Sequence, residues 1–204
     1  MYRYLDSLLA NTKKKIRTEF NHVGSMGFDE LNVVNTRRVT QEMYDRLLVE
    51  NEAVYRKAAK KAYRDAGGSK GVEENFVEGV LLAYNLVTGY LYGKEAERKR
   101  LRLNEQILTA REYADRDMLR SGLRTSANLW YTQTVQYGVD IVDAATLKAY
   151  KDNGIEYVKW ISQDDGKECA ECDSRHGKIF RITEVPAKTH YGCRCYLKPV
   201  EKEQ

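Results

Sequence analysis

The cysteines of this 204-residue chain all fall within one short C-terminal stretch. They are arranged as a C-x-x-C pair followed by a C-x-C pair: Cys169, Cys172, Cys193 and Cys195. Two thiolates spaced as C-x-x-C can bind one metal ion from a single tight turn, and a second pair of ligands completes the tetrahedron of a structural zinc site. The pattern therefore predicts that this stretch folds around one structural metal ion, with zinc as the ion.

The four cysteines are joined by a fifth candidate ligand, His190, for a site that takes only four. Two residues separate His190 from Cys193, as they separate Cys169 from Cys172. The spacing favours one C-x-x-C pair and one H-x-x-C pair as the four ligands: Cys169, Cys172, His190 and Cys193. In a strand, however, Cys193 and Cys195 lie on one face while Arg194 lies on the other, so Cys195 is the alternative for the fourth position. His176, in the same stretch, is a further candidate.

Two other states of the four thiols are compatible with this pattern. An even number of cysteines in a segment with little core of its own is also typical of disulfides, which contribute roughly 2–4 kcal/mol. Structural zinc supplies about 10–16 kcal/mol in small fingers, and a reducing cytoplasm disfavours disulfides. Free thiols in a packed module are the third possibility. The combined spacing favours the metal site.

The segments around the cysteines have the composition of short strands. β-branched and aromatic residues are frequent in residues 155–161, 178–182 and 193–197. We expect these segments to form a small antiparallel sheet. Such a sheet buries little surface when it stands alone, so a metal ion would have to stabilise it.

The rest of the chain has the composition of a helical bundle. No proline precedes Pro186, and apolar residues recur at helical spacing between charged ones. The predicted helices cover residues 2–20, 29–65, 71–102, 104–137 and 144–153. Glycines mark the expected breaks, including one at Gly138. The apolar stripe of the third helix predicts the centre of the bundle: Phe76, Val80, Tyr84, Val87 and Leu91.

These patterns together predict a mainly α protein. Residues 1–153 are expected to form a helical bundle body. Residues 154–204 are expected to form a small α+β module with short antiparallel strands, clamped by the Cys/His metal site. No stretch approaches the ~20 apolar residues of a membrane span. The first residues lack the apolar core of a signal peptide, so we expect synthesis in the cytoplasm and no membrane partner.

The formal net charge of +4 belongs to the predicted helical body, because basic and acidic residues balance from residue 151 onward. The basic clusters are Lys13, Lys14 and Lys15; Arg56, Lys57, Lys60 and Lys61; and Lys94, Arg98, Lys99, Arg100 and Arg102. Such clusters could make weak, non-specific contacts with DNA phosphates. The alternative is that they are solvated helix faces, because acidic residues such as Glu95 and Glu97 lie among them.

The sequence contains no complete catalytic motif. It lacks a G-x-S-x-G elbow, a phosphate-binding loop and an H-E-x-x-H helix. A zinc-supported nuclease would use His176 or His190 as the general base, and Asp164, Asp165 or Asp173 to hold a catalytic ion. A histidine retained as a structural ligand cannot also act as a free base. We therefore expect a protein that is not an enzyme, with a nuclease as the alternative.

A wider set of C-terminal positions carries a family resemblance. The positions are Trp160-Ile161, Asp164, Cys169-x-x-Cys172, Gly177-Lys178-Ile179-Phe180, Pro186 and His190-x-x-Cys193-Arg194-Cys195. They resemble the C-terminal signature of the phage Mu protein F-like family. Residues 124–128 also resemble the helical stretch found ahead of that signature, so the resemblance covers about residues 120–200.

This resemblance implies a minor head, or head-morphogenesis, protein of a tailed phage. Such a protein is a low-copy structural component of the capsid interior of the virion, made in the host cytoplasm. Its implied partners are the portal and other capsid or scaffold proteins, with which it acts in capsid assembly or DNA delivery. The resemblance also implies a framework role for Trp160 and Pro186 and suspected metal ligands at Cys169, Cys172, His190, Cys193 and Cys195.

Overall fold

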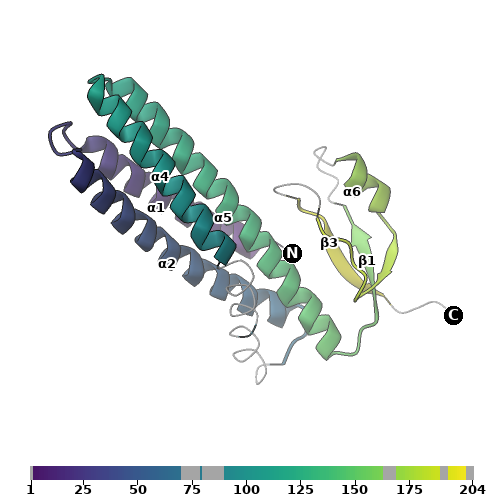
Figure 1. Ribbon diagram of the computed structural model, residues 1–204. Coiled ribbons are helices and arrows are strands. Elements are labelled where there is room, and N and C mark those ends of the chain that lie inside the picture. The colour runs from purple at the N-terminus through teal and green to yellow at the C-terminus, as the bar shows by residue number, and fades with distance from the viewer. Residues whose placement is uncertain (1, 70–78, 80–89, 163–168, 189–192, 201–204) are drawn as a thin grey trace. The chain divides into compact units, whose positions relative to one another are not determined.

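The computed structural model describes residues 2–69, 79, 90–162, 169–188 and 193–200 (Figure 1). By their internal contacts, the residues group into two compact units. The sheet unit comprises Met1–Asp6, Tyr55–Val80 and Val135–Gln204, and the helical unit comprises Ser7–Val54 and Leu81–Thr134. The predicted division into domains 1–153 and 154–204 is a different partition and stays a prediction.

The described residues are mostly helical, which confirms the predicted fold class. The helices are α1 (Arg3–Ser25), α2 (Val33–Asp65), α4 (Tyr90–Glu112), α5 (Arg116–Asp152) and the short α6 (Ala170–Arg175). Most of the predicted third helix, with all of its apolar stripe except Leu91, lies outside the described residues. None of the described helices is long and apolar enough to cross a membrane.

The break between α1 and α2 lies later than predicted. Helix α1 continues through Gly24, where an added Cβ would come within 3.1 Å of the Leu123 side chain. This glycine therefore allows close packing and does not end the helix. Helix α2 begins only at Val33, because the side-chain oxygen of Asn32 caps it by accepting a hydrogen bond from the backbone N–H of Asn35 (3.0 Å).

The prediction of one helix over residues 104–137 is wrong, because the chain turns between α4 and α5. Ala114 adopts a positive φ of 50° there, and the Asp115 carboxylate caps α5 by accepting from the backbone N–H groups of Asp117 and Met118 (both 2.9 Å). The predicted break at Gly138 is also wrong. A Cβ at Gly138 would lie 2.9 Å from the Leu5 side chain, so this glycine makes room for α1.

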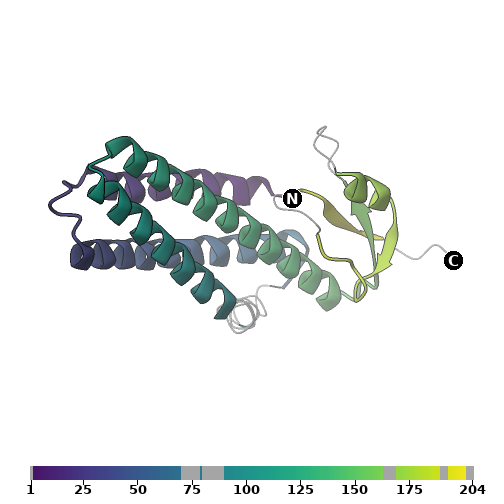
Figure 2. The same cartoon turned by 45° about the horizontal axis from the view of Figure 1, so that its top comes forward.

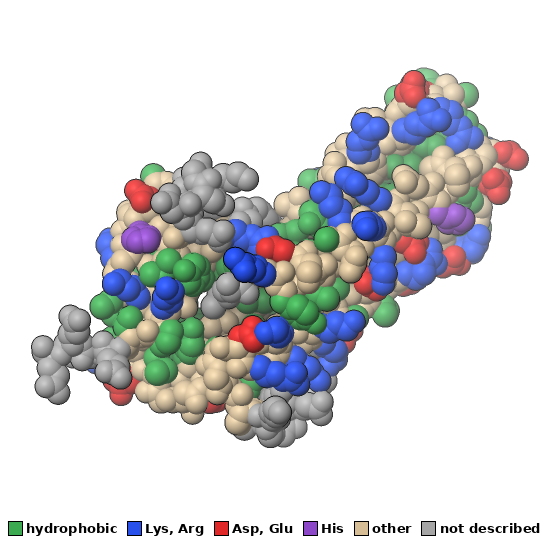
Figure 3. Space-filling model, turned by 180° about the vertical axis from the view of Figure 1, so that it is seen from behind, with side chains coloured by type: hydrophobic (Ala, Val, Ile, Leu, Met, Phe, Trp, Pro, Cys, Tyr) green, Lys and Arg blue, Asp and Glu red, His purple; other side chains and the backbone are tan. Residues whose placement is uncertain are grey.

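The helical unit has a continuous apolar core contributed by α1, α2, α4 and α5. The four segments run side by side in both views (Figures 1 and 2). Tyr44 lies at the centre and makes edge-to-face contacts with Phe20 and Trp130, with ring centroids 6.2 and 5.0 Å away. On the surface, Lys and Arg side chains are spread over this unit with Asp and Glu among them (Figure 3).

The sheet unit contains a three-stranded antiparallel sheet, as predicted. The strands are β1 (Tyr157–Ile161), β2 (Ile179–Arg181) and β3 (Tyr196–Val200), in the order β2-β1-β3. The third strand begins at Tyr196, after the cysteines, and not at residue 193 as predicted. Pro199 is tolerated in β3 because that strand pairs only with β1 among the described strands.

The sheet shares its core with the end of α5. Val158, Trp160 and Leu197 are buried on one face of the sheet, together with the cysteines and Tyr150 of α5. The Tyr150 hydroxyl donates to the backbone carbonyl of Leu197 (3.3 Å). The sulfur cluster therefore sits inside a packed apolar environment.

Candidate metal centre

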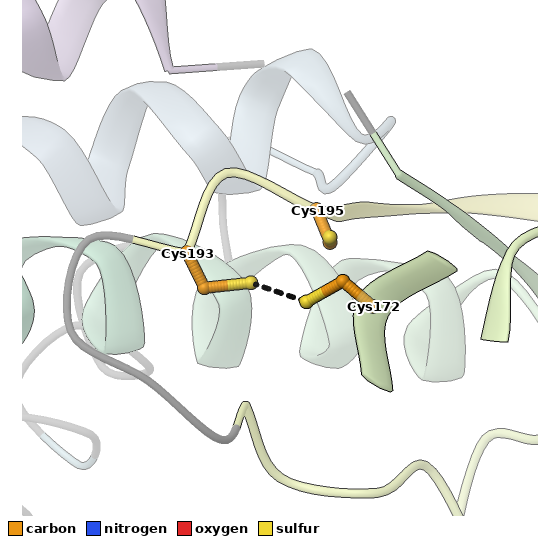
Figure 4. A group of neighbouring side chains, drawn as sticks. All are labelled: Cys172, Cys193 and Cys195. Atoms are coloured by element: carbon orange, nitrogen blue, oxygen red, sulfur yellow. Dashed lines mark hydrogen bonds between the residues drawn. The ribbon is translucent and has the colours of Figure 1, made fainter. Parts of the chain in front are cut away.

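Three cysteine sulfurs converge in the sheet unit (Figure 4). The Sγ atoms of Cys172, Cys193 and Cys195 all lie within 4.8 Å of one another, and those of Cys172 and Cys193 are 3.5 Å apart. Two thiolates bound to one zinc ion at about 2.3 Å in tetrahedral geometry lie about 3.8 Å apart. The 3.5 Å spacing is far longer than the ~2.05 Å of a disulfide bond, and none of the four cysteines forms one. The group could hold a metal ion.

Helix α6, which sequence reasoning missed, positions Cys172. Cys169 is the N-cap residue of this helix, in an extended conformation with φ −84° and ψ 154°. Its Sγ accepts a hydrogen bond from the backbone N–H of Cys172 (3.3 Å). Glu171 and Asp173 in the first turn favour a helix start at this point, and they are the signal that could have identified it.

The segment before β3 supplies the other two sulfurs. Cys193 and Cys195 both turn their side chains toward Cys172, as Figure 4 shows. Arg194 between them points elsewhere: its guanidinium pairs with the Asp6 carboxylate (2.6 Å) and lies over the Tyr2 ring, 5.3 Å from its centroid. This alternation lets two cysteines separated by a single residue face the same point.

Tyr2, the residue directly before α1, anchors this segment. The Tyr2 hydroxyl donates to Asp143 Oδ1 (2.5 Å) and lies 3.0 Å from the backbone carbonyl of Cys195. Lys188 donates to the same hydroxyl and forms an ion pair with Asp143 Oδ2 (2.6 Å). The backbone of Cys195, a candidate ligand, is thereby held by the side chain of Tyr2, which is 193 positions away in the sequence.

Burial dominates the electrostatics of this Tyr2–Asp143–Lys188 cluster. It raises the pKa of Tyr2 well above its usual value, and the Asp143 carboxylate raises it further. Burial also raises the pKa of Asp143, and the positive charge of Lys188 lowers that pKa in part. The buried Asp143 carboxylate depends on Tyr2 and Lys188 to offset the cost of removing its charge from water.

Burial also shapes the chemistry of the thiols. Cys172 and Cys193 are each 1% exposed and Cys195 is 4% exposed. Burial is the main reason that the pKa values of Cys172 and Cys193 are raised, and hydrogen bonds with neighbouring thiols raise that of Cys172 further. Thiolates in such a site need a compensating cation, and soft thiolate ligands suit zinc. The donor set therefore fits a thiolate-bound dication.

The other predicted site residues fall into two groups. His190, Asp164 and Asp165 lie outside the described residues. His176 lies at the C-terminal end of α6, where its Nδ1 accepts from the backbone N–H of Ser162 (3.2 Å) and lies 2.6 Å from the Ser162 hydroxyl. It is not a member of the described sulfur group. The alternative nuclease site stays an untested prediction.

Comparison with known proteins gives one match. Residues 98–198 match a family model described as "Phage Mu protein F like protein". The matched range includes most of α4, the whole of α5, β1, β2, the first part of β3 and all four cysteines. No curated protein and no solved structure matches the chain.

Proposed function

Residues 98–198 belong to the Phage Mu protein F-like family, and from this premise we propose that the chain is a minor head protein that acts with the portal of a tailed phage. The family is one of phage head-morphogenesis proteins. The family match carries the proposal, because it includes α5, most of α4 and the cysteine-bearing segments around the sheet. The proposed role is structural, in capsid assembly or DNA delivery, and places the chain inside the virion.

We further propose that the sulfur group binds one zinc ion. Cys172, Cys193 and Cys195 would supply three ligands, and the fourth would be Cys169 or His190. Cys169 is supported by its position one turn ahead of Cys172 in α6. A site with four protein ligands is closed and has no open position for a reacting water, which favours a structural role over a catalytic one.

The bound ion would join two parts of the sheet unit that lie on either side of β2 in the sequence. Cys172 lies on α6, whereas Cys193 and Cys195 precede β3. Cross-linking these segments would hold the sheet and the first turn of α1 in one fixed arrangement. A rigid surface of this kind suits a protein that docks on other capsid components.

The test is co-expression with the portal protein encoded by the same phage, followed by size-exclusion chromatography. We expect the chain to co-elute with portal oligomers, and the major capsid protein expressed in place of the portal serves as the control. Heads purified from infected cells are expected to contain the chain at low copy number. A chain that neither binds the portal nor enters heads would overturn the proposal.

The nuclease alternative has its own test. Supercoiled plasmid is incubated with the purified chain in Mg²⁺ and in Mn²⁺, and the structural role predicts intact plasmid in both. Cleavage that is abolished by His176→Ala or by His190→Ala, but not by His22→Ala, would establish the enzyme instead. His22 is a suitable control because it is an exposed histidine in the helical unit.

A further inference from the structure

The helical unit contains a groove of about 620 Å³ between α1 and α5. Gly24 allows these helices to approach closely, because a side chain there would contact Leu123 at 3.1 Å. The polar side chains that line the groove are Arg17, Asn21 and Ser25 from α1, and Arg120, Arg124 and Asn128 from α5. Three of these six are arginines, and no lining residue is acidic.

The arginines are largely uncompensated. Arg17 and Arg124 form no ion pair with any of the residues that the structure describes. Arg120 contacts Asp117 at 3.4 Å, but the two side chains are 70% and 93% exposed, and an exposed pair of this length contributes little. The groove therefore presents positive charge that the protein itself does not neutralise.

A neighbouring groove in the same unit has the opposite character. It has a volume of about 670 Å³, lies between α4 and α5, and is lined by Glu105 and Asp117 without any lysine or arginine. Of these two grooves, the α1–α5 groove is lined by basic side chains and the α4–α5 groove is not.

The groove offers charge and hydrogen-bond donors but few apolar anchors. Its apolar lining residues Phe20, Leu123 and Ala127 are only 2%, 5% and 7% exposed. Protein segments that dock in grooves depend on apolar or aromatic anchors that become buried, so an acidic peptide is a poor fit. Arginine with neutral asparagine and serine side chains is the set that contacts phosphate and sugar oxygens in nucleic acids.

The basic side chains recur along both helices. Arg120 and Arg124 are four residues apart on α5, and Lys13 and Arg17 have the same spacing on α1, which corresponds to about 6 Å along each axis. Lys13 does not line the groove, but its ammonium lies over the ring of Tyr131 on α5, 4.8 Å from the centroid, so it also bridges α1 and α5. A regularly repeated anion matches such rows of cations better than a single small ion does.

We propose that the α1–α5 groove binds the phosphodiester backbone of duplex DNA without reading its sequence. The site is independent of the metal centre and of the proposed role with the portal. Its lining arginines, Arg17, Arg120 and Arg124, belong to none of the basic clusters that the sequence suggested, although the row on α1 continues to Lys13 of one cluster.

The experiment measures binding of the full chain to a fluorescent duplex of random sequence by anisotropy, between about 50 and 200 mM salt. The groove variant is Arg17→Gln/Arg120→Gln/Arg124→Gln. The control variant, Arg37→Gln/Lys151→Gln/Lys178→Gln, removes the same charge from exposed residues that neither line the groove nor belong to a basic cluster. Circular dichroism checks that both triple variants fold. If the groove variant does not fold, the single variant Arg124→Gln replaces it.

We expect the groove variant to raise Kd at least about tenfold at the lowest salt, and to reduce the slope of log K against log salt by up to about 2.7. Arg124→Gln alone should reduce the slope by about 0.9. The control should bind within about threefold of the unchanged chain. Equal weakening by both triple variants, or no binding of duplex by the unchanged chain, would overturn the proposal. Displacement of the duplex by poly-glutamate or inorganic phosphate as readily as by unlabelled DNA would overturn it as well.

Discussion

At the scale of single residues, the sulfurs of Cys172, Cys193 and Cys195 converge from α6 and from the segment before β3. They are three of the four cysteines in the C-x-x-C and C-x-C pairs of the sequence. The Tyr2 hydroxyl contacts the Cys195 carbonyl and is itself held by Asp143 and Lys188. No local sequence pattern predicts these contacts, because Tyr2 is far from Asp143, Lys188 and Cys195 in the sequence. Long-range contacts of this kind follow from the tertiary fold.

The identity of the fourth ligand can be settled by substitution. We expect Cys172→Ser to abolish metal binding and to lower the free energy of unfolding by more than about 2 kcal/mol, because it removes one of the converging sulfurs. Of Cys169→Ser and His190→Ala, the one that removes the fourth ligand should weaken metal binding to a similar degree.

Metal content after dialysis and chemical denaturation are the measurements, and His22→Ala is the control. If neither Cys169→Ser nor His190→Ala changes metal retention, the proposed set of four ligands is wrong.

Tyr2→Phe tests the anchor between α1 and the cysteine segment. The change removes only the hydroxyl, leaving a buried carboxylate and the Cys195 carbonyl with fewer partners. We expect the free energy of unfolding to fall by about 1–3 kcal/mol, as measured by urea denaturation. Tyr113→Phe, at an exposed position of the helical unit, should have almost no effect. Equal stability of the two variants would show that the Tyr2 hydroxyl contributes nothing.

At the scale of elements, the type of every described element except α6 followed from the sequence better than its bounds. Helical spacing and the absence of proline predicted α1, α2 and α5, and β-branched composition predicted the strands. Helix breaks were predicted at Gly24 and Gly138, but both glycines lie inside helices, where they allow a neighbouring side chain to pack closely. Glycine is common at helix ends as well, so composition alone does not separate the two roles. The turn at Ala114 carries no glycine or proline, so composition gave no sign of it.

Two glycines of α5 provide a matched pair of substitutions. Alanine is favoured over glycine in a helix by about 1 kcal/mol, so Gly122→Ala should stabilise the protein by up to that amount. The atoms nearest to a Cβ at Gly122 belong to the exposed Gln106 side chain, which can move. Gly138→Ala should instead be destabilising by about 1–2 kcal/mol, because the buried Leu5 side chain at 2.9 Å cannot move freely.

Thermal denaturation of the two variants measures this difference. Stabilisation by both substitutions would mean that Leu5 repacks readily and that the contact at Gly138 is not tight.

At the scale of the whole molecule, the chain combines two units with different sources of stability. The helical unit has a core of aromatic and aliphatic side chains, whereas the sheet unit places three cysteines inside its core. Sequence composition indicated these two kinds of structure. It could not show that α1, α2 and α5 each contribute residues to both units, because that depends on long-range contacts.

Removal of the metal should therefore act unequally on the two units. With a chelator present, we expect backbone amides of β1, β3 and α6 to exchange hydrogen at least about tenfold faster, since the free energy of metal binding is lost from that unit. Amides in the middle of α4 should be unaffected. Hydrogen exchange measured by mass spectrometry reports both sets in one experiment. Uniform acceleration in both units would contradict this division of stability.

The central claim is that the converging sulfurs hold a metal ion, and X-ray absorption at the zinc edge of the purified chain tests it most directly. Metal analysis of the same sample should return about one zinc ion per chain, and the absorption spectrum should show at least three sulfur neighbours at about 2.3 Å. A chain that contains no zinc after purification without chelators, or zinc with only oxygen and nitrogen neighbours, would contradict the account.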